Sequence, residues 1–332
     1  MTYYRKLLFA LGAVPALALS LGQVGCSNAG TTTTDPAADT STGDSKVLVG
    51  TFLVSLVAPD TANGTAGYTS VIGKVSDGPT PLQVAYVESA SSGSCKLLKP
   101  RVPFCNSACT GGAVCVDDDL CQSYPTAKSV GTVHATGIRT SAGATEFSMD
   151  PIANNYQPTG GITLPYPAFA EGDAIQLDAS GGAYRPFSLS STGISPLKLL
   201  STSIKLASAQ ALNLSWTPPG SAGAGAKVAV KLDISHHGGT KGLISCEADD
   251  TGSLTIAASL ITELLNLGTA GFPTIIVTRT APVGSAVIAP GRVELTISSA
   301  VEQAIEVPGV VSCKDTAECP AGQSCQSDLT CK

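Results

Sequence analysis

Cysteines are the residues of this chain whose type and spacing most clearly point to chemistry. Eleven are present, and two groups of four are regularly spaced. The members are Cys105, Cys109, Cys115 and Cys121, then Cys313, Cys319, Cys325 and Cys331. Thiols can bind zinc, but zinc sites need C-x2-C pairs or nearby histidines, and neither group has them. We therefore expect disulfides, which form and persist in oxidising compartments.

The pairing is constrained if each group closes on itself. We then expect the first cysteine to pair with the third and the second with the fourth, which gives Cys105–Cys115, Cys109–Cys121, Cys313–Cys325 and Cys319–Cys331. Each bond would close a short loop and contribute ~3 kcal/mol in the chain-entropy account. Cys95 and Cys246 remain for each other. The alternative pairs Cys95 with a cysteine of a group and leaves Cys246 to seek another partner.

Two polar clusters could bind a metal ion. His236 and His237 are adjacent, so in a strand they would point to opposite faces, and both could bind one ion only where a turn distorts the backbone. His134 is the one other histidine. The acidic run Asp117–Asp119 lacks the spaced oxygen ligands and distal glutamate of a calcium loop. We expect no metal and no cofactor, and interpret the acidic run as a solvated loop.

The stretch Asp250-Thr251-Gly252-Ser253 resembles the signature of aspartic peptidases. The resemblance implies that Asp250 is a catalytic carboxyl of an exported hydrolase, with His236 or His237 as weaker candidates. Such an aspartate shares a proton with a second one, yet the sequence has no second copy of the motif. Asp-Gly pairs are also ordinary turn residues. We therefore expect no catalytic residue and no enzyme activity.

The beginning of the sequence has the layout of an export signal over residues 1–25, with two basic residues before an apolar run. The following Val24-Gly25-Cys26 resembles the lipobox of bacterial lipoproteins, from which Gln23 departs. The resemblance implies lipidation of Cys26 and, with Ser27 next to it, sorting to the outer membrane of a Gram-negative bacterium. Lipidation also leaves ten cysteines, an even number, for disulfides.

The alternative N-terminal processing is ordinary signal cleavage after Ala18, which would give a secreted or periplasmic protein with a spare thiol. In either case the stretch that follows Cys26, up to residue 46, contains no large apolar side chain. This composition predicts a flexible Thr- and Asp-rich tether over residues 26–46. The formal net charge is −6, and no basic cluster is present. We expect no nucleic-acid partner. Membrane contact through a lipid anchor and an envelope or extracellular protein partner fit this composition.

The elements that must position the cysteines are mainly β. Alternating apolar residues predict one β domain over 47–192, with a cysteine-rich insertion at 95–124. Strands are expected at 47–57, 70–75 and 82–87, among others. The loop from Tyr156 to Phe169 could bind a small ligand, but anchoring of the loop to the sheet by its aromatic residues is the favoured interpretation.

A second β domain is predicted over 193–310. Leu212 to Trp216 and Val228 to Ile234 each present one apolar face, so the two runs should line a common core. They resemble the opening strands of fibronectin type III and other immunoglobulin-like domains, which implies a second β-sandwich. One short helix is expected near 259–267, with Ser259 as its N-cap.

The cysteine-rich segment 311–332 closes the sequence. Its C-x5-C-P-x-G-x2-C-x5-C pattern, carried by the four cysteines together with Pro320 and Gly322, is similar to the Dickkopf N-terminal cysteine-rich pattern found in surface lipoproteins of Gram-negative soil bacteria. The resemblance implies an exported protein and no established activity. We expect a non-catalytic lipoprotein of the cell envelope with a structural, adhesive or binding role; the alternatives are the hydrolase and a small-ligand binder.

Overall fold

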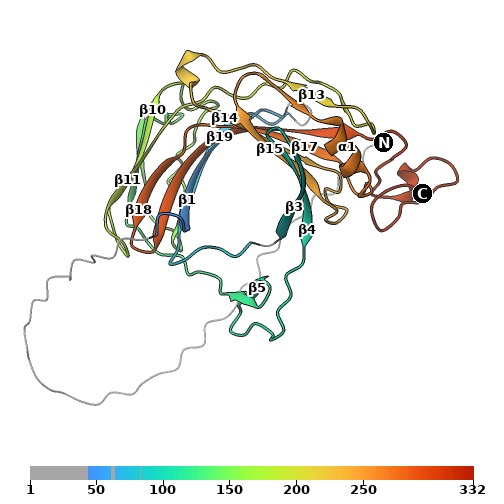
Figure 1. Cartoon of the computed structure of the whole chain (residues 1–332). Helices are drawn as coiled ribbons and strands as arrows, with labels where there is room; N and C mark the ends of the chain where they lie inside the picture. Colours follow the sequence, from blue (N-terminus) through green and yellow to red (C-terminus); the bar gives the residue numbers. More distant parts are fainter. Residues whose placement is uncertain (1–43, 61–63, 83) are drawn as a thin grey trace, which may run out of the picture. The chain divides into compact units, whose positions relative to one another are not determined.

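The computed structural model describes residues 44–60, 64–82 and 84–332. The expected signal segment, Cys26 and nearly all of the tether lie outside these residues. Strands dominate the regular secondary structure of the described chain (Figure 1). In these ranges, no helix has the length and apolar character that a membrane span requires.

A sheet of 11 strands dominates the described residues. Its main path runs β3-β4-β15-β14-β17-β19-β1-β2-β9, and β12 and β18 also pair with β19. The strands are β1 (Leu48–Val57), β2 (Tyr68–Val75), β3 (Ala85–Ser92), β4 (Cys95–Arg101), β9 (Asn155–Tyr156), β12 (Ile204–Lys205), β14 (Lys227–Asp233), β15 (Leu243–Asp249), β17 (Thr274–Thr280), β18 (Gly284–Ile288) and β19 (Gly291–Glu306).

Three smaller sheets accompany the large one in the described part of the chain. Four strands form the order β11-β10-β7-β8, and two pairs stand alone. The four are β7 (Val133–Thr136), β8 (Glu146–Met149), β10 (Ala174–Ala179) and β11 (Phe187–Thr192); the pairs are β13 (Leu212–Ser215) with β16 (Ser253–Ile256), and β5 (Val114–Asp117) with β6 (Leu120–Gln122). The helical elements are α1 (Ala258–Leu265) and two 3-10 turns, Ser221–Gly223 and Thr316–Glu318.

The long strand β19 connects two hydrophobic cores. Its odd-numbered residues are the more buried ones, because successive side chains of a strand point to opposite faces. Val293 and Leu295 in its first half belong to one core, and Ile305 near its end belongs to the other. Both cores therefore lie on the same face of the large sheet.

The first core is a sandwich between the β1, β2 and β18 region of the large sheet and the four-stranded sheet. Phe52 and Val54 of β1 pack there with Leu177 of β10 and Leu189 of β11, all fully buried or nearly so. The second core lies between the β14, β15 and β17 region and a cover made of β13, β16 and α1. The mainly β, sandwich-like prediction is confirmed, and the two sandwiches share one sheet.

The two apolar runs predicted to line the second core do so. Leu214 and Trp216 come from the cover, and Val228 and Val230 come from β14 of the large sheet. The helix prediction needs a small correction: α1 begins at Ala258, its N-cap residue is Ala257, and no side chain caps it. Ser259 is the second residue of the helix and is therefore not its N-cap.

The largest difference from the sequence-based expectation concerns the β3–β4 hairpin. Cys95 was expected to begin the cysteine-rich insertion of the first domain, but it lies in β4 and belongs, with Leu97, to the second core. β4 pairs with β15, so the hairpin extends the second half of the large sheet. The chain leaves the first core before β3, which starts at Ala85 rather than at the expected Leu82. Pairing with a distant strand decides this placement, and local periodicity does not encode it.

Candidate functional site

Five disulfides hold the cysteine-rich parts of the described chain. The pairs are those that the spacing argument favoured: Cys95–Cys246, Cys105–Cys115, Cys109–Cys121, Cys313–Cys325 and Cys319–Cys331. We call residues 104–124 module 1 and residues 311–332 module 2. Each module has few large apolar residues, so its two disulfides replace a hydrophobic core.

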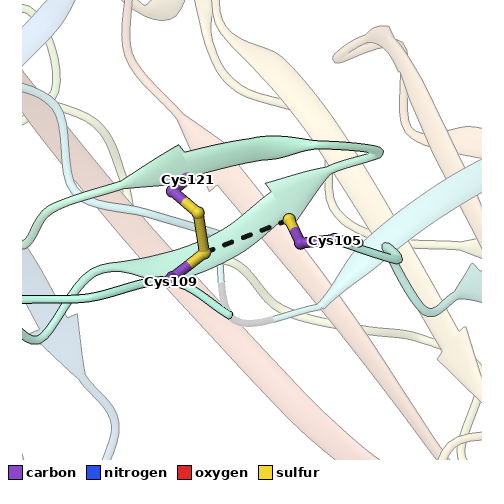
Figure 2. Close-up of side chains that lie close together, drawn as sticks. All are labelled: Cys105, Cys109 and Cys121. Atoms are coloured by element: carbon purple, nitrogen blue, oxygen red, sulfur yellow. Dashed lines mark hydrogen bonds between the residues drawn. A yellow bond between two sulfur atoms is a disulfide. The ribbon is translucent and has the colours of Figure 1, made fainter. Parts of the chain in front are cut away.

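The sulfur atoms are crowded in the same way in both modules. In module 1, Cys109 is bonded to Cys121, and its sulfur lies 4.0 Å from that of Cys105 (Figure 2). The corresponding three sulfurs of module 2 are also within 4.8 Å of one another. All of these sulfurs are in disulfides, and a metal ion needs thiolates. In the oxidised modules these sulfurs are therefore not available as metal ligands.

The disulfide Cys95–Cys246 fixes the β3–β4 hairpin to the second core. The two cysteines lie directly opposite each other on β4 and β15, with Cα atoms 4.0 Å apart. Both are buried, at 1% and 2% exposure. This bond, together with the backbone pairing, gives the hairpin a rigid base from which module 1 extends.

An ion-pair cluster joins the hairpin to module 1. Arg101 at the end of β4 contacts Asp117 and Asp118, each at 2.7 Å. The pKa of Asp117 is lowered, first by the N–H that Asp118 donates to it and then by Arg101. Asp119 accepts from the backbone and side chain of Asn106. The acidic run thus holds the module in shape, which explains its three adjacent carboxylates without calcium.

Exposed apolar side chains gather where the hairpin meets module 1. Of the sixteen large hydrophobic residues exposed in the described chain, eight lie in this region. We call these eight the hairpin-module surface: Leu82, Val84, Tyr86, Val87, Val102, Phe104, Leu120 and Tyr124. Contacts link the segments that carry them: β3 pairs with β4, Arg101 contacts Asp117, and Gln122 donates to the carbonyl of Pro79. Tyr86 and Val87 follow each other in β3, so the exposed groups lie on both faces of the hairpin. Clustered exposed apolar groups mark interaction sites.

Asp250, the peptidase-like candidate, is part of a buried ion pair. Its carboxylate accepts from Arg279 Nε at 2.5 Å and from Trp216 Nε1 at 2.6 Å. The side chains of Asp250 and Arg279 are each only 1% exposed. Arg279 also donates to Ser195 Oγ and to the carbonyl of Thr217. Both carboxylate oxygens are therefore engaged in joining strands of the second core.

The histidine candidates lie apart from these groups. His237 has a positive φ of 63°, and the rings of His236 and His237 are tilted by 51° to each other with centroids 3.9 Å apart. The turn expected as a condition for joint ligation is thus present, but the described residues place no third ligand in a metal-binding cluster with them. His134 lies on β7 of the other core, 3.6 Å from Glu146.

The Tyr156–Phe169 loop is anchored by its aromatic residues. Tyr156 and Phe169 are each 1% exposed, and the Tyr156 hydroxyl accepts from the N–H of Val130. Just beyond the loop is an open pocket with a volume of about 400 Å³, lined by Gly137, Arg139, Thr145, Ala170, Asp173 and Ala174. No sequence motif marks this pocket, because its residues come from segments that are separated along the chain.

Comparison with known proteins gives no assignment. No family model matches the sequence, and no curated protein matches it. Among solved structures, the fibronectin domains FN1–FN3 of chicken CNTN1 are similar at 10% identity, over 73% of this chain and 80% of that chain, with a TM-score of 0.19. A TM-score this low does not establish a shared fold. The function must be argued from the surface itself.

Proposed function

We propose that this chain is a non-catalytic extracytoplasmic protein, anchored by lipid at Cys26, that binds an envelope or extracellular protein through the hairpin-module surface. The observation that carries the proposal is the concentration of exposed apolar side chains on a disulfide-braced projection. Val102 is 89% exposed, Leu82 77% and Phe104 67%. Leaving such groups in water forgoes burial worth about 1.5–3 kcal/mol for each side chain, which a partner would recover.

The disulfides support an extracytoplasmic location, because bonds of this number and spacing persist in oxidising compartments. The lipid anchor rests on the residues around Cys26 and on the even number of cysteines that remains. The intact mass of membrane-extracted protein tests it. A chain that begins at Cys26 and carries acyl groups is the expected result, and an unmodified chain cut near Ala18 would refute the anchor.

Site-specific photo-crosslinking tests the binding role. A benzophenone amino acid at Phe104 should crosslink to a discrete protein on the surface of cells that express the chain. The matched control is the same amino acid at Val287, which is 54% exposed but lies on β18 beside the first core. Equal crosslinking from both positions, or none from Phe104, would refute the proposal.

The surroundings of Asp250 favour a structural role over the hydrolase alternative. Asp250→Asn would leave Arg279 buried without its counter-charge, which typically costs about 3–5 kcal/mol. We expect this variant to lose stability in denaturant unfolding. A variant that keeps wild-type stability but loses a peptidase activity would favour the hydrolase instead.

The pocket beside the Tyr156–Phe169 loop supports a second candidate function, binding of a small carboxylate. The Arg139 side chain lines the pocket and has no ion-pair partner among the described residues, while Asp173 accepts from the N–H of Ala170. Chemical-shift titration with acetate and glycine tests this. Shifts around Arg139 that vanish in Arg139→Gln and persist in Arg185→Gln would establish the site.

A further inference from the structure

The two modules share a core that allows their residues to be matched. In each, the third and fourth cysteines lie opposite each other: Cys115 faces Cys121, and Cys325 faces Cys331. The next pair outward also corresponds, since Val114 lies opposite Gln122 and Ser324 exchanges two backbone hydrogen bonds with Lys332. Leu120 in module 1 is therefore the counterpart of Thr330 in module 2.

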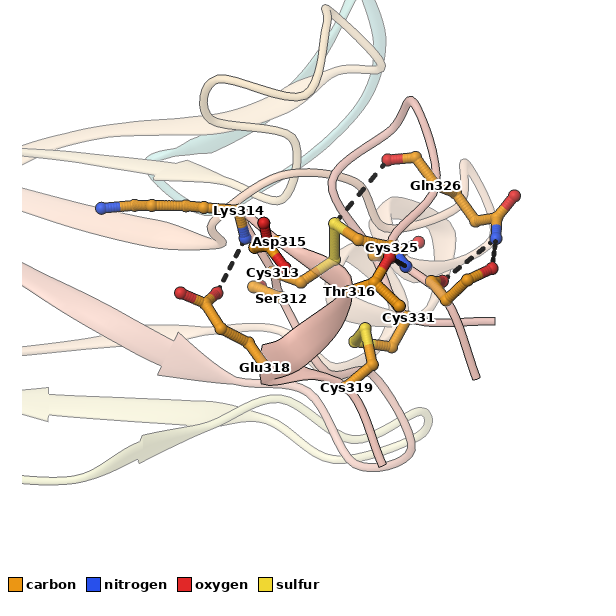
Figure 3. The surroundings of a disulfide bond; sticks show 12 residues. Ser312, Cys313, Lys314, Asp315, Thr316, Glu318, Cys319, Cys325, Gln326 and Cys331 are labelled. Atoms are coloured by element: carbon orange, nitrogen blue, oxygen red, sulfur yellow. Dashed lines mark hydrogen bonds between the residues drawn. A yellow bond between two sulfur atoms is a disulfide. The ribbon is translucent and has the colours of Figure 1, made fainter. Parts of the chain in front are cut away.

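The modules differ in what lies beside their last extended segment, which is β6 in module 1 and residues 330–332 in module 2. In module 2 the leading segment Val311–Cys313 runs beside it: the N–H of Cys331 donates to the carbonyl of Val311 at 2.9 Å, and that of Cys313 to Leu329 at 3.0 Å. Figure 3 shows Ser312 and Cys313 of this segment among the residues around the module's disulfides. In module 1 the residues before Cys105 do not run along β6. They end at the turn before this strand, where the carbonyl of Phe104 accepts from the N–H of Asp119.

The outer edge of β6 consequently stays open. Within the described residues, β6 pairs with β5 alone. By the correspondence with Cys331, the N–H of Cys121 faces this open edge. A strand edge with free backbone groups is a template for a further strand.

The side chains around this edge also suit a partner. Leu120 is 55% exposed, whereas its counterpart Thr330 is 2% exposed. Phe104 and Tyr124, at 67% and 55%, flank the same edge in sequence. Module 1 carries three aspartates and no lysine or arginine. Arg101 of β4 pairs with Asp117 and Asp118, so part of this charge is balanced. The edge therefore combines apolar contact with a local excess of negative charge.

We propose that the outer edge of β6 binds an extended segment of a partner protein, which adds as a strand in the place that Val311–Cys313 takes on module 2. This inference rests on the proposed function and names the chemistry of the partner: a segment in which apolar residues alternate with lysine or arginine. Backbone hydrogen bonds hold the segment in register, while Phe104, Leu120 and Tyr124 contact its apolar side chains.

A displayed library of random heptapeptides, panned on the oxidised full chain, provides the probe. Peptides with alternating apolar and basic residues should be enriched. Leu120→Lys should weaken their binding at least about tenfold, because an inserted charge blocks strand addition at an edge. Val287→Lys makes a similar change at a position of similar exposure and should leave binding unchanged.

Two readouts identify strand addition itself. The bound peptide should slow hydrogen exchange at the amide of Cys121, followed by NMR. N-methylation of alternate peptide amides should abolish binding, while methylation of the intervening amides should not. No enrichment, equal binding to Leu120→Lys, or unchanged exchange at Cys121 would overturn the inference.

Two other occupants are outcomes of the same test. Concentration-dependent dimerisation lost in Leu120→Lys would replace the peptide by a second copy of the chain, and binding to phosphatidylcholine vesicles lost in that variant would replace it by a lipid surface. Either result overturns the strand-addition inference. If Phe104 crosslinks to a protein while the exchange at Cys121 stays unchanged in that complex, the inference fails and the proposed binding role stands.

Discussion

The two disulfide modules are built alike but differ in how much of their surface the rest of the protein covers. Module 2 lies against the body of the protein: Cys313 is fully buried, Gly271 donates its N–H to the carbonyl of Asp328, and Ser312 donates to the carbonyl of Gly271. Module 1 contacts its hairpin mainly through Arg101 and the acidic run, and it leaves Phe104 and Leu120 in solvent.

This difference shows that a module with two disulfides does not by itself determine a role. Its disulfides keep it folded whether or not its surface is covered. They act by lowering the conformational entropy of the unfolded chain, and they do not depend on buried surface area. One module can therefore pack against the body of the protein while the other keeps its surface exposed to solvent. Stability should depend on module 2 and binding on module 1.

The largest expected effect comes from removing equivalent disulfides. Cys313→Ser with Cys325→Ser should reduce the free energy of unfolding by ~3 kcal/mol, because the bond closes a short loop next to the body. Cys105→Ser with Cys115→Ser should unfold module 1 alone and leave the main thermal transition in place. Calorimetry of both double variants measures the difference. Equal losses of melting temperature would mean that module 1 is as strongly coupled to the body as module 2.

A smaller effect is expected at the glycine that meets module 2. Gly271 has a φ of 57°, and an added Cβ would lie 2.0 Å from the carbonyl oxygen of His236. Gly271→Ala should therefore cost about 2 kcal/mol or more, since it combines left-handed strain with a clash. Gly112→Ala in module 1 is the matched control, with a φ of 77° and no neighbour within 4 Å.

The control should show the conformational cost alone, about 1 kcal/mol, and only within module 1. Chemical denaturation of the two variants separates these contributions. If Gly271→Ala costs no more than Gly112→Ala, the turn around Gly271 relaxes enough to relieve the contact of the added Cβ with the carbonyl oxygen of His236.

The parts of the molecule that sequence predicts well are local. Cysteine spacing favoured the disulfide pairing within each module, because short loops limit which partners can meet. Period-two alternation located β13 and β14 and their shared core, since one apolar face must be buried. The remaining pair, Cys95–Cys246, followed once the modules were closed.

The parts that sequence did not predict depend on distant contacts. The residues Ala85–Ser92 of β3 are exposed on both faces, so they show no alternation that would reveal the hairpin. Asp250 and Arg279 are 29 residues apart, and only the fold brings them together. The open edge of β6 is visible only by comparison with Val311–Cys313, which lies nearly two hundred residues further along the sequence.

A single hydroxyl provides a finer test of the same comparison. Ser312 and Phe104 each precede the first cysteine of a module. Ser312→Ala removes the 2.6 Å hydrogen bond to the carbonyl of Gly271 and should cost about 1 kcal/mol. Phe104→Ser removes an exposed ring and should change stability by less than about 0.5 kcal/mol. Urea unfolding of both variants would contradict the assignment if Phe104→Ser were the more destabilising.

Acid should loosen the two modules through different carboxylates. In module 2 the pKa of Asp328 is lowered to about 2, first by Lys332 and then by Thr330, both within the module. Its stabilising effect is thus present above the ordinary value of 3.8 and is lost as the pH falls toward about 2. In module 1 the pKa of Asp117 is also lowered, and one cause is Arg101 on β4.

Protonation of Asp328 therefore weakens contacts within module 2. Protonation of Asp117 weakens its hydrogen bond with the N–H of Asp118 inside module 1, and also the ion pair with Arg101 that joins the module to its hairpin. NMR titration in acid should show the signals of Thr330 and Lys332 shifting together in module 2, and Asp328→Asn should remove this step. In module 1 the signals of Arg101 should follow those of Asp117. Added salt should reproduce this second change near neutral pH, because the Arg101 pair is exposed and screened. The Lys332–Asp328 pair is exposed as well, so salt should also weaken it, but inside module 2. Arg101 signals that fail to follow those of Asp117 would contradict a link between module 1 and its hairpin through this pair.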